Sequence, residues 1–240
     1  MSSILTLIRE RHSSRAPFDS RRAVPAETLR QILEAGRWAP TAHNMQNFEV
    51  LVVDEPGLLD RIGHIESKVS EMFLRENLAQ LSFSVEELRH KKVGLLGTMF
   101  PSSWQAPDEI EIVARESAPT SLHHTMQGAP VVLVVLHDAR RRAPASEGDV
   151  LGQNSLGCVL ENMWLMAQEL GVGFQVMSVF SGPGVESQVK AMLDVPERLK
   201  IAFAIRLGYP VSEPTSPRVR RDVDDFTHRN GFGKKGLGGG

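Results

Sequence analysis

The chain has 240 residues and carries 27 Lys and Arg against 29 Asp and Glu, a formal charge of −2. This balance argues against a nucleic-acid partner, because phosphate contacts need a surplus of positive side chains. No apolar run approaches the roughly 20 residues that cross a bilayer, and the first residues do not read as a secretory signal. A single cysteine, Cys158, excludes an internal disulfide and a cysteine-based zinc cage. We therefore expect a cytoplasmic globular protein without a membrane or nucleic-acid partner.

The first fifty residues predict two helices and a loop. Residues 3–12 place apolar side chains on one helical face, with Ser2 or Ser3 as the N-cap. A second helix is expected to run to about Gly36, because Pro25 suits a first helical turn. The loop that follows (APTAHNMQN, residues 39–47) contains a proline and two asparagines.

The middle of the chain predicts two strands and a long helix. Phe48–Val53 is a β-branched run typical of a buried strand. A helix is expected from Pro56 to roughly Gln80, and residues 81–125 mix helical and loop signals. The strongest strand signal of the chain is Val131–Leu136 (VVLVVL).

The second half continues the alternation of helices and strands. We expect a long helix over residues 152–170, a strand over 174–179, a helix over 183–193 and a strand over 201–207. Strands and helices that alternate in this loose way indicate a layered α+β or α/β domain.

Three polar clusters could bind a ligand. In the first, Arg11 and Arg15 flank two serine hydroxyls, which suits a phosphate or another oxyanion. The second is the loop 40–47, rich in donors and acceptors and leading into a strand. The third is the C-terminal group Arg218, Arg220 and Arg221. By itself, the first cluster is more typical of a solvated surface, and the second is as typical of a hydrogen-bonded turn as of a binding loop. The third cluster by itself is typical of a solvated face or tail.

Other kinds of site find little support. His123 and His124 are adjacent, so their side chains diverge, and there is no His-Glu-x-x-His motif; we expect no metal site. A Gly-x-Ser-x-Gly elbow for serine hydrolysis is missing. Cys158 lies in an apolar helical run, as a small packing residue would.

Five segments, taken together and in this order, resemble the nitroreductase superfamily of FMN-dependent oxidoreductases. They are IRERHSSRAPFD (residues 8–19), WAPTAHNMQNFEVLVV (38–53), GFQVMSVFSG (173–182), AFAIRLGYP (202–210) and RVRRDVDDFTHRNGF (218–232). The resemblance covers most of the chain except roughly residues 60–128.

The resemblance implies an α+β fold with a mostly antiparallel central sheet flanked by helices, in an intertwined homodimer with two FMN sites at its interface. Residues 1–210 would form the FMN-binding domain, within which residues 60–128 are atypical and would cover the substrate. Residues 211–232 would extend over the partner subunit. Residues 233–240 would be a disordered tail.

The resemblance also assigns roles to residues. Arg11 and Ser13 would hold the FMN phosphate or ribityl chain, and Arg15 would be the catalytic residue, its charge stabilising the reduced flavin from the pyrimidine edge. The remaining cofactor contacts are expected from His12, Gln153, Arg218 and Arg220, from Pro40, Thr41, Ala42 and Asn44 of the partner subunit, and from Met177, Ser178, Val179 and Ser181 beside the ring.

The implied reaction passes a hydride from NADPH or NADH through flavin N5 to an electron-poor acceptor, by a ping-pong sequence. Nitroaromatic, quinone or unsaturated carbonyl compounds are the acceptors that the family implies. The turn 178–182 lacks the Pro-Glu-Gly of several relatives, which leaves the N5 contact open. Two alternatives also stay open: a flavin-binding homodimer without redox turnover, acting as a sensor or storage module, and an enzyme that consumes the flavin.

Overall fold

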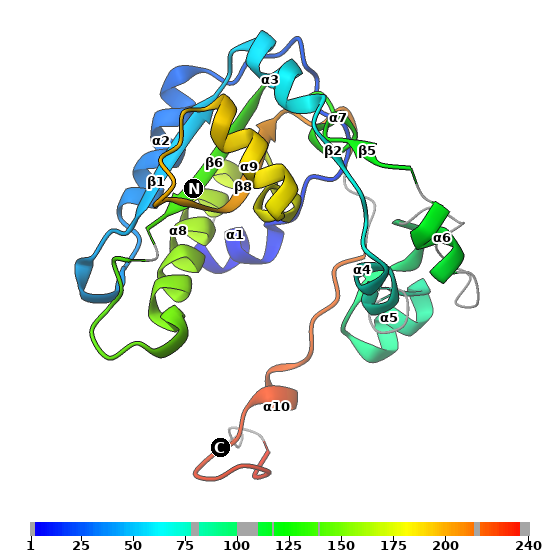
Figure 1. Ribbon diagram of the computed structural model, residues 1–240. Helices are drawn as coiled ribbons and strands as arrows, with labels where there is room; N and C mark the ends of the chain where they lie inside the picture. The colour runs from blue at the N-terminus through cyan, green and yellow to red at the C-terminus, as the bar shows by residue number, and fades with distance from the viewer. Residues whose placement is uncertain are drawn as a thin grey trace. The chain divides into compact units, whose positions relative to one another are not determined.

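The computed structural model describes residues 3–77, 82–99, 110–116, 118–138, 140–213 and 217–235 (Figure 1). The chain divides into two compact units. The first comprises Met1–Ser67 and Thr120–Pro214, and the second comprises Lys68–Pro119 and Thr215–Gly240.

A four-stranded sheet forms the centre of the first unit. Its strands are β1 (Phe48–Val53), β6 (Val131–His137), β8 (Lys200–Gly208) and β7 (Gly173–Met177), in the spatial order β1-β6-β8-β7. Every neighbouring pair in this sheet is antiparallel. This arrangement confirms the mostly antiparallel sheet that the resemblance implies.

Strand β6 is buried on both faces, which explains its uninterrupted apolar sequence. Val131, Leu133 and Val135 pack into the core on one face of the sheet. Val132 and Val134 point into the core on the opposite face, since successive side chains of a strand alternate.

Helices cover both faces of the sheet. On one face lie α2 (Ala26–Arg37) and α8 (Val150–Glu169), whose apolar side chains join those of β6 and β8. On the other face lie α3 (Pro56–Gly63), α7 (His123–Met126) and α9 (Pro183–Met192) (Figure 1). The short α1 (Ile4–Glu10) contacts α8 but contains no buried residue.

The structure corrects three expectations about these elements. Strand β1 is an edge strand in which only Val53 is buried, because β6 flanks it on one side alone. The strand expected over 174–179 ends at Met177 and continues as the 3-10 turn η7 (Ser178–Ser181). The prediction of a single helix from Pro56 to Gln80 is wrong, because α3 ends at Gly63.

That helix is interrupted because the chain turns into the core after Gly63. Ile65 is 3% exposed, and its carbonyl accepts a hydrogen bond from Leu122 N. β2 (Glu66–Ser67) then pairs with β5 (Thr120–Ser121). A new helix, α4 (Glu71–Glu76), begins with Ser70 as its N-cap, and residues 78–81 lie outside the described ranges.

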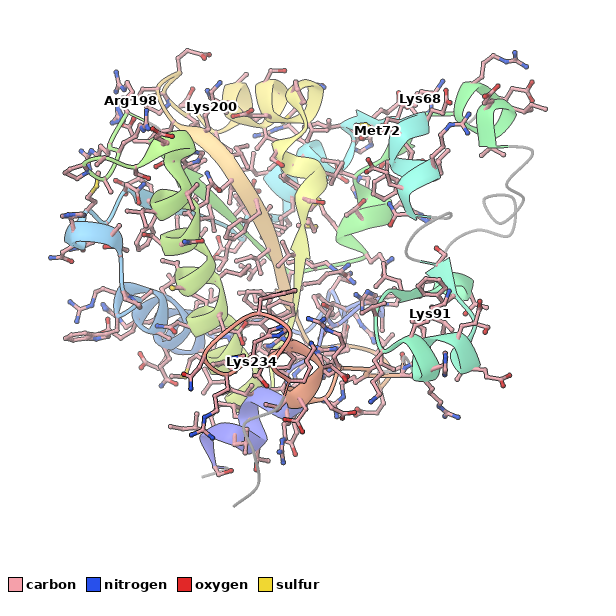
Figure 2. The ribbon with its side chains drawn as sticks, turned by 90° about the horizontal axis from the view of Figure 1, so that it is seen from below. Lys68, Met72, Lys91, Arg198, Lys200 and Lys234 are labelled. Atoms are coloured by element: carbon pink, nitrogen blue, oxygen red, sulfur yellow. The ribbon has the colours of Figure 1, made fainter. Side chains whose placement is uncertain are left out.

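The second unit is built from short elements. It contains α4, β3 (Ser82–Phe83) paired in parallel with β4 (Leu95–Leu96), α5 (Val85–Lys91), η3 (Gly97–Met99), α6 (Ile110–Glu116) and α10 (Val223–Phe226). The Lys91 ammonium, labelled in Figure 2, lies 3.8 Å from the Phe83 ring centroid. Lys92, just after α5, pairs with Asp222, which connects this unit's two chain segments. Among the described helices, none is both long and apolar enough to cross a membrane.

Candidate functional site

Residues 11–18, which we call the arginine loop, lie along the edge strand β7. Ser14 N donates to the carbonyl of Phe174 at 2.9 Å, and Ser14 Oγ accepts from Phe174 N at 3.2 Å. At the end of the loop, Phe18 is 4% exposed and forms an isolated bridge with Pro210. The loop is therefore fixed to the sheet at both of these points.

A fully buried arginine on β8 holds the same loop from beneath. The Arg206 guanidinium donates to the carbonyls of Ser14 (2.9 Å), Ala16 (3.1 Å) and Met126 (3.1 Å) and to Gln175 Oε1 (2.8 Å). Desolvation lowers the pKa of Arg206 to about 10, so the group remains charged at neutral pH. We did not assign this residue from the sequence, although a lone charge within the apolar strand AFAIRLG was the available signal.

Arg11 connects the loop to helix α8. Its Nε lies 3.2 Å from Oε1 of Glu161, and its guanidinium carbon lies 4.2 Å from the centroid of the Trp164 ring. That buried Nε has an ion-pair contact but no hydrogen-bond partner among the described residues. Trp164 Nε1 donates to the His12 carbonyl at 3.1 Å, which anchors the beginning of the loop to the same helix.

Arg15 and Ser13 present donors that the described part of the chain does not use. Neither side chain has a hydrogen-bond or ion-pair partner there, whereas Arg11 is already paired with Glu161. Desolvation lowers the pKa of Arg15, although the residue is exposed, and its charge persists at neutral pH. A guanidinium partly shielded from water and without a counter-charge fits an anionic ligand, because charge-assisted hydrogen bonds offset its desolvation.

The second expected cluster is held by the first half of α8. Ala42, in the 3-10 turn η1 (Ala42–Asn44), donates its backbone N–H to Ser155 Oγ at 3.0 Å. Within the loop, Thr41 Oγ1 accepts from Gln46 N and Asn44 Oδ1 accepts from the Gln46 side chain. Pro40 and Asn44 are exposed, while Thr41 and Ala42 are half-buried. Ser155 is a positioning residue that our sequence analysis missed.

Helix α8 separates this loop from the arginine loop. Ser155 and Trp164 are nine positions apart, which corresponds to roughly 14 Å along a helix at about 1.5 Å per residue. Gln153 is exposed and lies a further two positions from Trp164. Within one chain, the arginine loop is thus joined to β7, whereas loop 40–47 lies towards the opposite end of α8.

The segment expected beside the flavin ring follows β7 directly. Met177 is buried, Val179 is half-buried, and Ser178 and Ser181 are exposed. Ser181 Oγ donates to the Ser178 carbonyl at 2.7 Å and so closes the η7 turn. The contact that this turn makes with a flavin stays a prediction.

The C-terminal arginines belong to the second unit. Arg218 and Arg220 are both exposed, and Arg220 donates to the carbonyl of Val219 at 2.7 Å. Their expected role at a phosphate stays a prediction.

An antiparallel sheet between helical layers defines an α+β protein, and Arg15, which has no partner among the described residues, gives it a candidate anion site. The sequence matches the model of the nitroreductase family over residues 8–209, and the chain belongs to this family. This membership confirms the resemblance carried by the five segments.

Known relatives agree with this assignment. The chain is 20% identical over 228 residues to an NADPH-dependent oxidoreductase of Staphylococcus haemolyticus, a match covering 95% of this chain and 73% of that protein. It shares its fold with FMN-bound nitroreductases of Bacteroides fragilis and Desulfitobacterium hafniense, with TM-scores of 0.59 and 0.58 and 20% identity to each. These matches cover 95% of this chain and 98% and 99% of the two solved chains.

Proposed function

We propose that this protein is an FMN-dependent oxidoreductase that oxidises NADPH or NADH and reduces an electron-poor small molecule. Membership of the nitroreductase family supports the class of reaction. The observation that carries the cofactor assignment is Arg15, a partly desolvated cation without a partner among the described residues. A nitroaromatic, a quinone or an unsaturated carbonyl compound is the acceptor we propose.

The chain's donors fit the charges of FMN. Arg11 and Ser13 would hold its phosphate or ribityl chain, with Arg218 and Arg220 contributed by the C-terminal extension. When bound, FMN supplies the capacity to take two electrons from a reduced nicotinamide and to pass them to a second substrate. Arg15 supplies positive charge from a loop that Arg206 keeps in place, so little reorganisation is needed when negative charge develops nearby.

We further propose that two copies of the chain form the working unit. Helix α1 exposes Ile4 (77%), Leu5 (54%) and Ile8 (44%), and the first turn of α8 exposes Val150 (58%) and Leu151 (39%). A seven-residue helix has little stability of its own in water, so an unburied apolar face on it favours a partner.

A second copy would also complete the ligand site. Loop 40–47 lies about 14 Å along α8 from the arginine loop of its own chain. In the proposed dimer, Pro40, Thr41, Ala42 and Asn44 of one copy approach the flavin held by the other, with His12, Gln153 and the 177–181 turn beside it. Residues 211–232 would lie on the partner subunit.

The test is an absorption spectrum of the purified protein, followed by anaerobic addition of NADPH or NADH. We expect a yellow protein whose flavin bands bleach, and the faster donor identifies the preferred nicotinamide. Parallel lines in double-reciprocal plots against an acceptor would support the ping-pong order.

Other outcomes would favour other functions. A yellow protein that neither nicotinamide bleaches indicates a binding module without turnover. Oxygen-dependent loss of the flavin spectrum after reduction indicates an enzyme that consumes flavin. A colourless protein that does not take up added FMN overturns the cofactor assignment.

A further inference from the structure

Three metal-ligating side chains converge where α3 meets α7, outside the arginine loop and loop 40–47. Asp60 and His64 lie one helical turn apart at the end of α3, and His123 begins α7. His123 Nε2 lies 3.4 Å from His64 Nδ1 and 3.5 Å from Asp60 Oδ1. His64 Nδ1 lies 3.7 Å from Asp60 Oδ2, and one ligand atom from each residue fits within 4.8 Å of the others.

The two separations that involve His123 match the edges of a metal coordination tetrahedron, and the separation between His64 Nδ1 and the other Asp60 oxygen is slightly longer. Zinc binds histidine nitrogen and carboxylate oxygen at about 2.0–2.2 Å, so neighbouring ligands of a tetrahedral site lie about 3.3–3.6 Å apart. The two histidine rings are close to perpendicular, at 81°, with centroids 4.9 Å apart. They therefore meet edge to face instead of stacking, which lets a nitrogen of each ring approach the same point.

The surrounding backbone holds His123 in place. A Cβ atom at Gly63 would lie 2.2 Å from Cε1 of the His123 ring, so only glycine allows this approach. Ser121 Oγ donates to the Gly63 carbonyl at 2.6 Å and accepts from His123 N at 3.1 Å. His123 is thereby positioned before any ion binds, which reduces the entropy that binding would cost.

His64 is the adjustable member of the cluster. Its Nδ1 lies 2.8 Å from the Asp60 carbonyl and can donate to it when protonated. The side chain is 71% exposed, so the ring can turn a little and exchange this hydrogen bond for a metal bond. In that exchange the neutral ring would carry its proton on Nε2, which leaves the Nδ1 lone pair free for the metal.

The cluster borders a cleft that could supply the fourth ligand. Asp60 and His123 line a cavity of about 450 Å³, together with Arg21, Asp54 and the start of β6 at Val131. Three protein ligands and one open position are the arrangement in which zinc keeps a water or binds a small oxygen ligand.

We propose that Asp60, His64 and His123 bind one Zn²⁺ or a similar divalent transition-metal ion, with water or a small anion from the cleft as the fourth ligand. The ion joins the C-terminal end of α3 to the N-terminal end of α7. The proposal does not depend on flavin binding, because none of its residues belongs to the arginine loop, to loop 40–47 or to the 177–181 turn.

The test measures metal binding by the full-length protein. After treatment with a chelator, the protein is dialysed against buffered Zn²⁺ and its metal content is determined. We expect one ion per chain and a raised thermal midpoint in the presence of Zn²⁺. Co²⁺ in place of Zn²⁺ should give the intense visible bands of a tetrahedral site, read as a difference spectrum against metal-free protein.

Variants locate the ion. His64→Ala, His123→Ala and Asp60→Asn should each weaken Zn²⁺ binding by at least about tenfold, since even indirect partners of metal ligands contribute 10- to 100-fold. His124→Ala is the matched control, because His124 is exposed and adjacent to His123 but is not part of the cluster. Circular dichroism checks that each variant folds. Gly63→Ala displaces the His123 ring without removing a ligand, so it should also weaken Zn²⁺ binding.

Three results would overturn the proposal. They are the absence of bound Zn²⁺ in the native chain, unchanged binding in His64→Ala, or equal loss in His124→Ala. Bleaching of FMN by a nicotinamide is measured separately, so failure of the metal site leaves the proposed oxidoreductase function unaffected.

Discussion

Arg206 shows how a buried charge can position a binding loop. Its guanidinium is fully buried, and its hydrogen bonds to the carbonyls of Ser14 and Ala16 hold a segment that leaves the regular ladder of the sheet. The ring of Phe18 covers it, with its centroid 4.5 Å from the guanidinium carbon. In the proposed function, Arg206 would therefore act on the flavin only through the loop that carries Arg15.

Replacing Arg206 should lower the free energy of unfolding. Arg206→Met leaves three carbonyls and Gln175 Oε1 without their donor, and we expect a loss of about 3–5 kcal/mol in the free energy of unfolding. Urea denaturation measures the loss, and the FMN affinity of the folded fraction should also fall.

The matched control is Arg198→Met, two residues before β8 begins (Figure 2). Arg198 is half-exposed and lies 3.8 Å from Asp138, so its replacement should cost less than about 1 kcal/mol. Equal losses in the two variants would contradict the role assigned to Arg206.

Replacing Arg15 should lower the rate of flavin reduction much more than it lowers the stability of the fold. Because its guanidinium has no protein partner in the described ranges, Arg15→Ala should leave the urea midpoint nearly unchanged. The rate of flavin reduction by NADPH should fall by roughly a hundredfold, the usual effect of removing one electrostatic donor.

Two comparison variants distinguish the loss of the Arg15 charge from a general loss of activity caused by removing an arginine. Arg15→Lys should recover part of the rate, and Arg30→Ala, on the exposed side of α2, should retain all of it. Normal FMN affinity and normal reduction in Arg15→Ala would refute the catalytic assignment.

At the scale of elements, the close approach of α2 and α8 organises one helical layer. A Cβ atom at Gly36 would lie 2.9 Å from Cγ of Met163, so the absence of a side chain allows the two helices to pack closely. The same layer carries Ser155, Glu161 and Trp164, which hold both predicted ligand loops. A shift of α8 should therefore move the two predicted ligand loops that these residues hold.

A large side chain at this crossing should destabilise the protein. Gly36→Leu forces α2 away from α8, and we expect a loss of about 1–3 kcal/mol in the free energy of unfolding. Gly184→Ala, on α9 with open space around it, should change the free energy by less than about 1 kcal/mol. Thermal unfolding of both variants checks the expectation, and a neutral Gly36→Leu would contradict it.

For the whole molecule, the exposed apolar residues of α1 bear on the proposed dimer. Charge at these positions would have to be buried in an interface, which is costly without a partner charge. The double variant Ile4→Lys and Ile8→Lys should therefore sediment as a monomer at concentrations where the native chain is a dimer, and should lose bound FMN. Met192→Lys, an exposed apolar position on α9, serves as the control. A dimeric double variant would argue against α1 as part of the interface.

Local patterns were sufficient to predict the buried elements. The strand β6 and the helix α8 were predicted correctly because the apolar run of a buried strand and the three-to-four-residue repeat of a helix are contained in the segment's own sequence. The prediction of one helix over Pro56–Gln80 was wrong because a contact distant in sequence ends it: Ile65 turns into the core, where its carbonyl accepts a hydrogen bond from Leu122 N.

The amino-acid sequence was enough to predict the nitroreductase family, the order of the main elements outside residues 60–128 and the polar cluster that contains Arg11, Ser13 and Arg15. Only the tertiary structure brought Arg206 beneath that loop, Ser155 against Ala42, and His64 beside His123. The physical reason is that periodicity, capping and turn chemistry act over a few residues, whereas these contacts join positions 59 to 192 residues apart. Such contacts depend on how the antiparallel sheet and its two helical layers return distant segments to the same place.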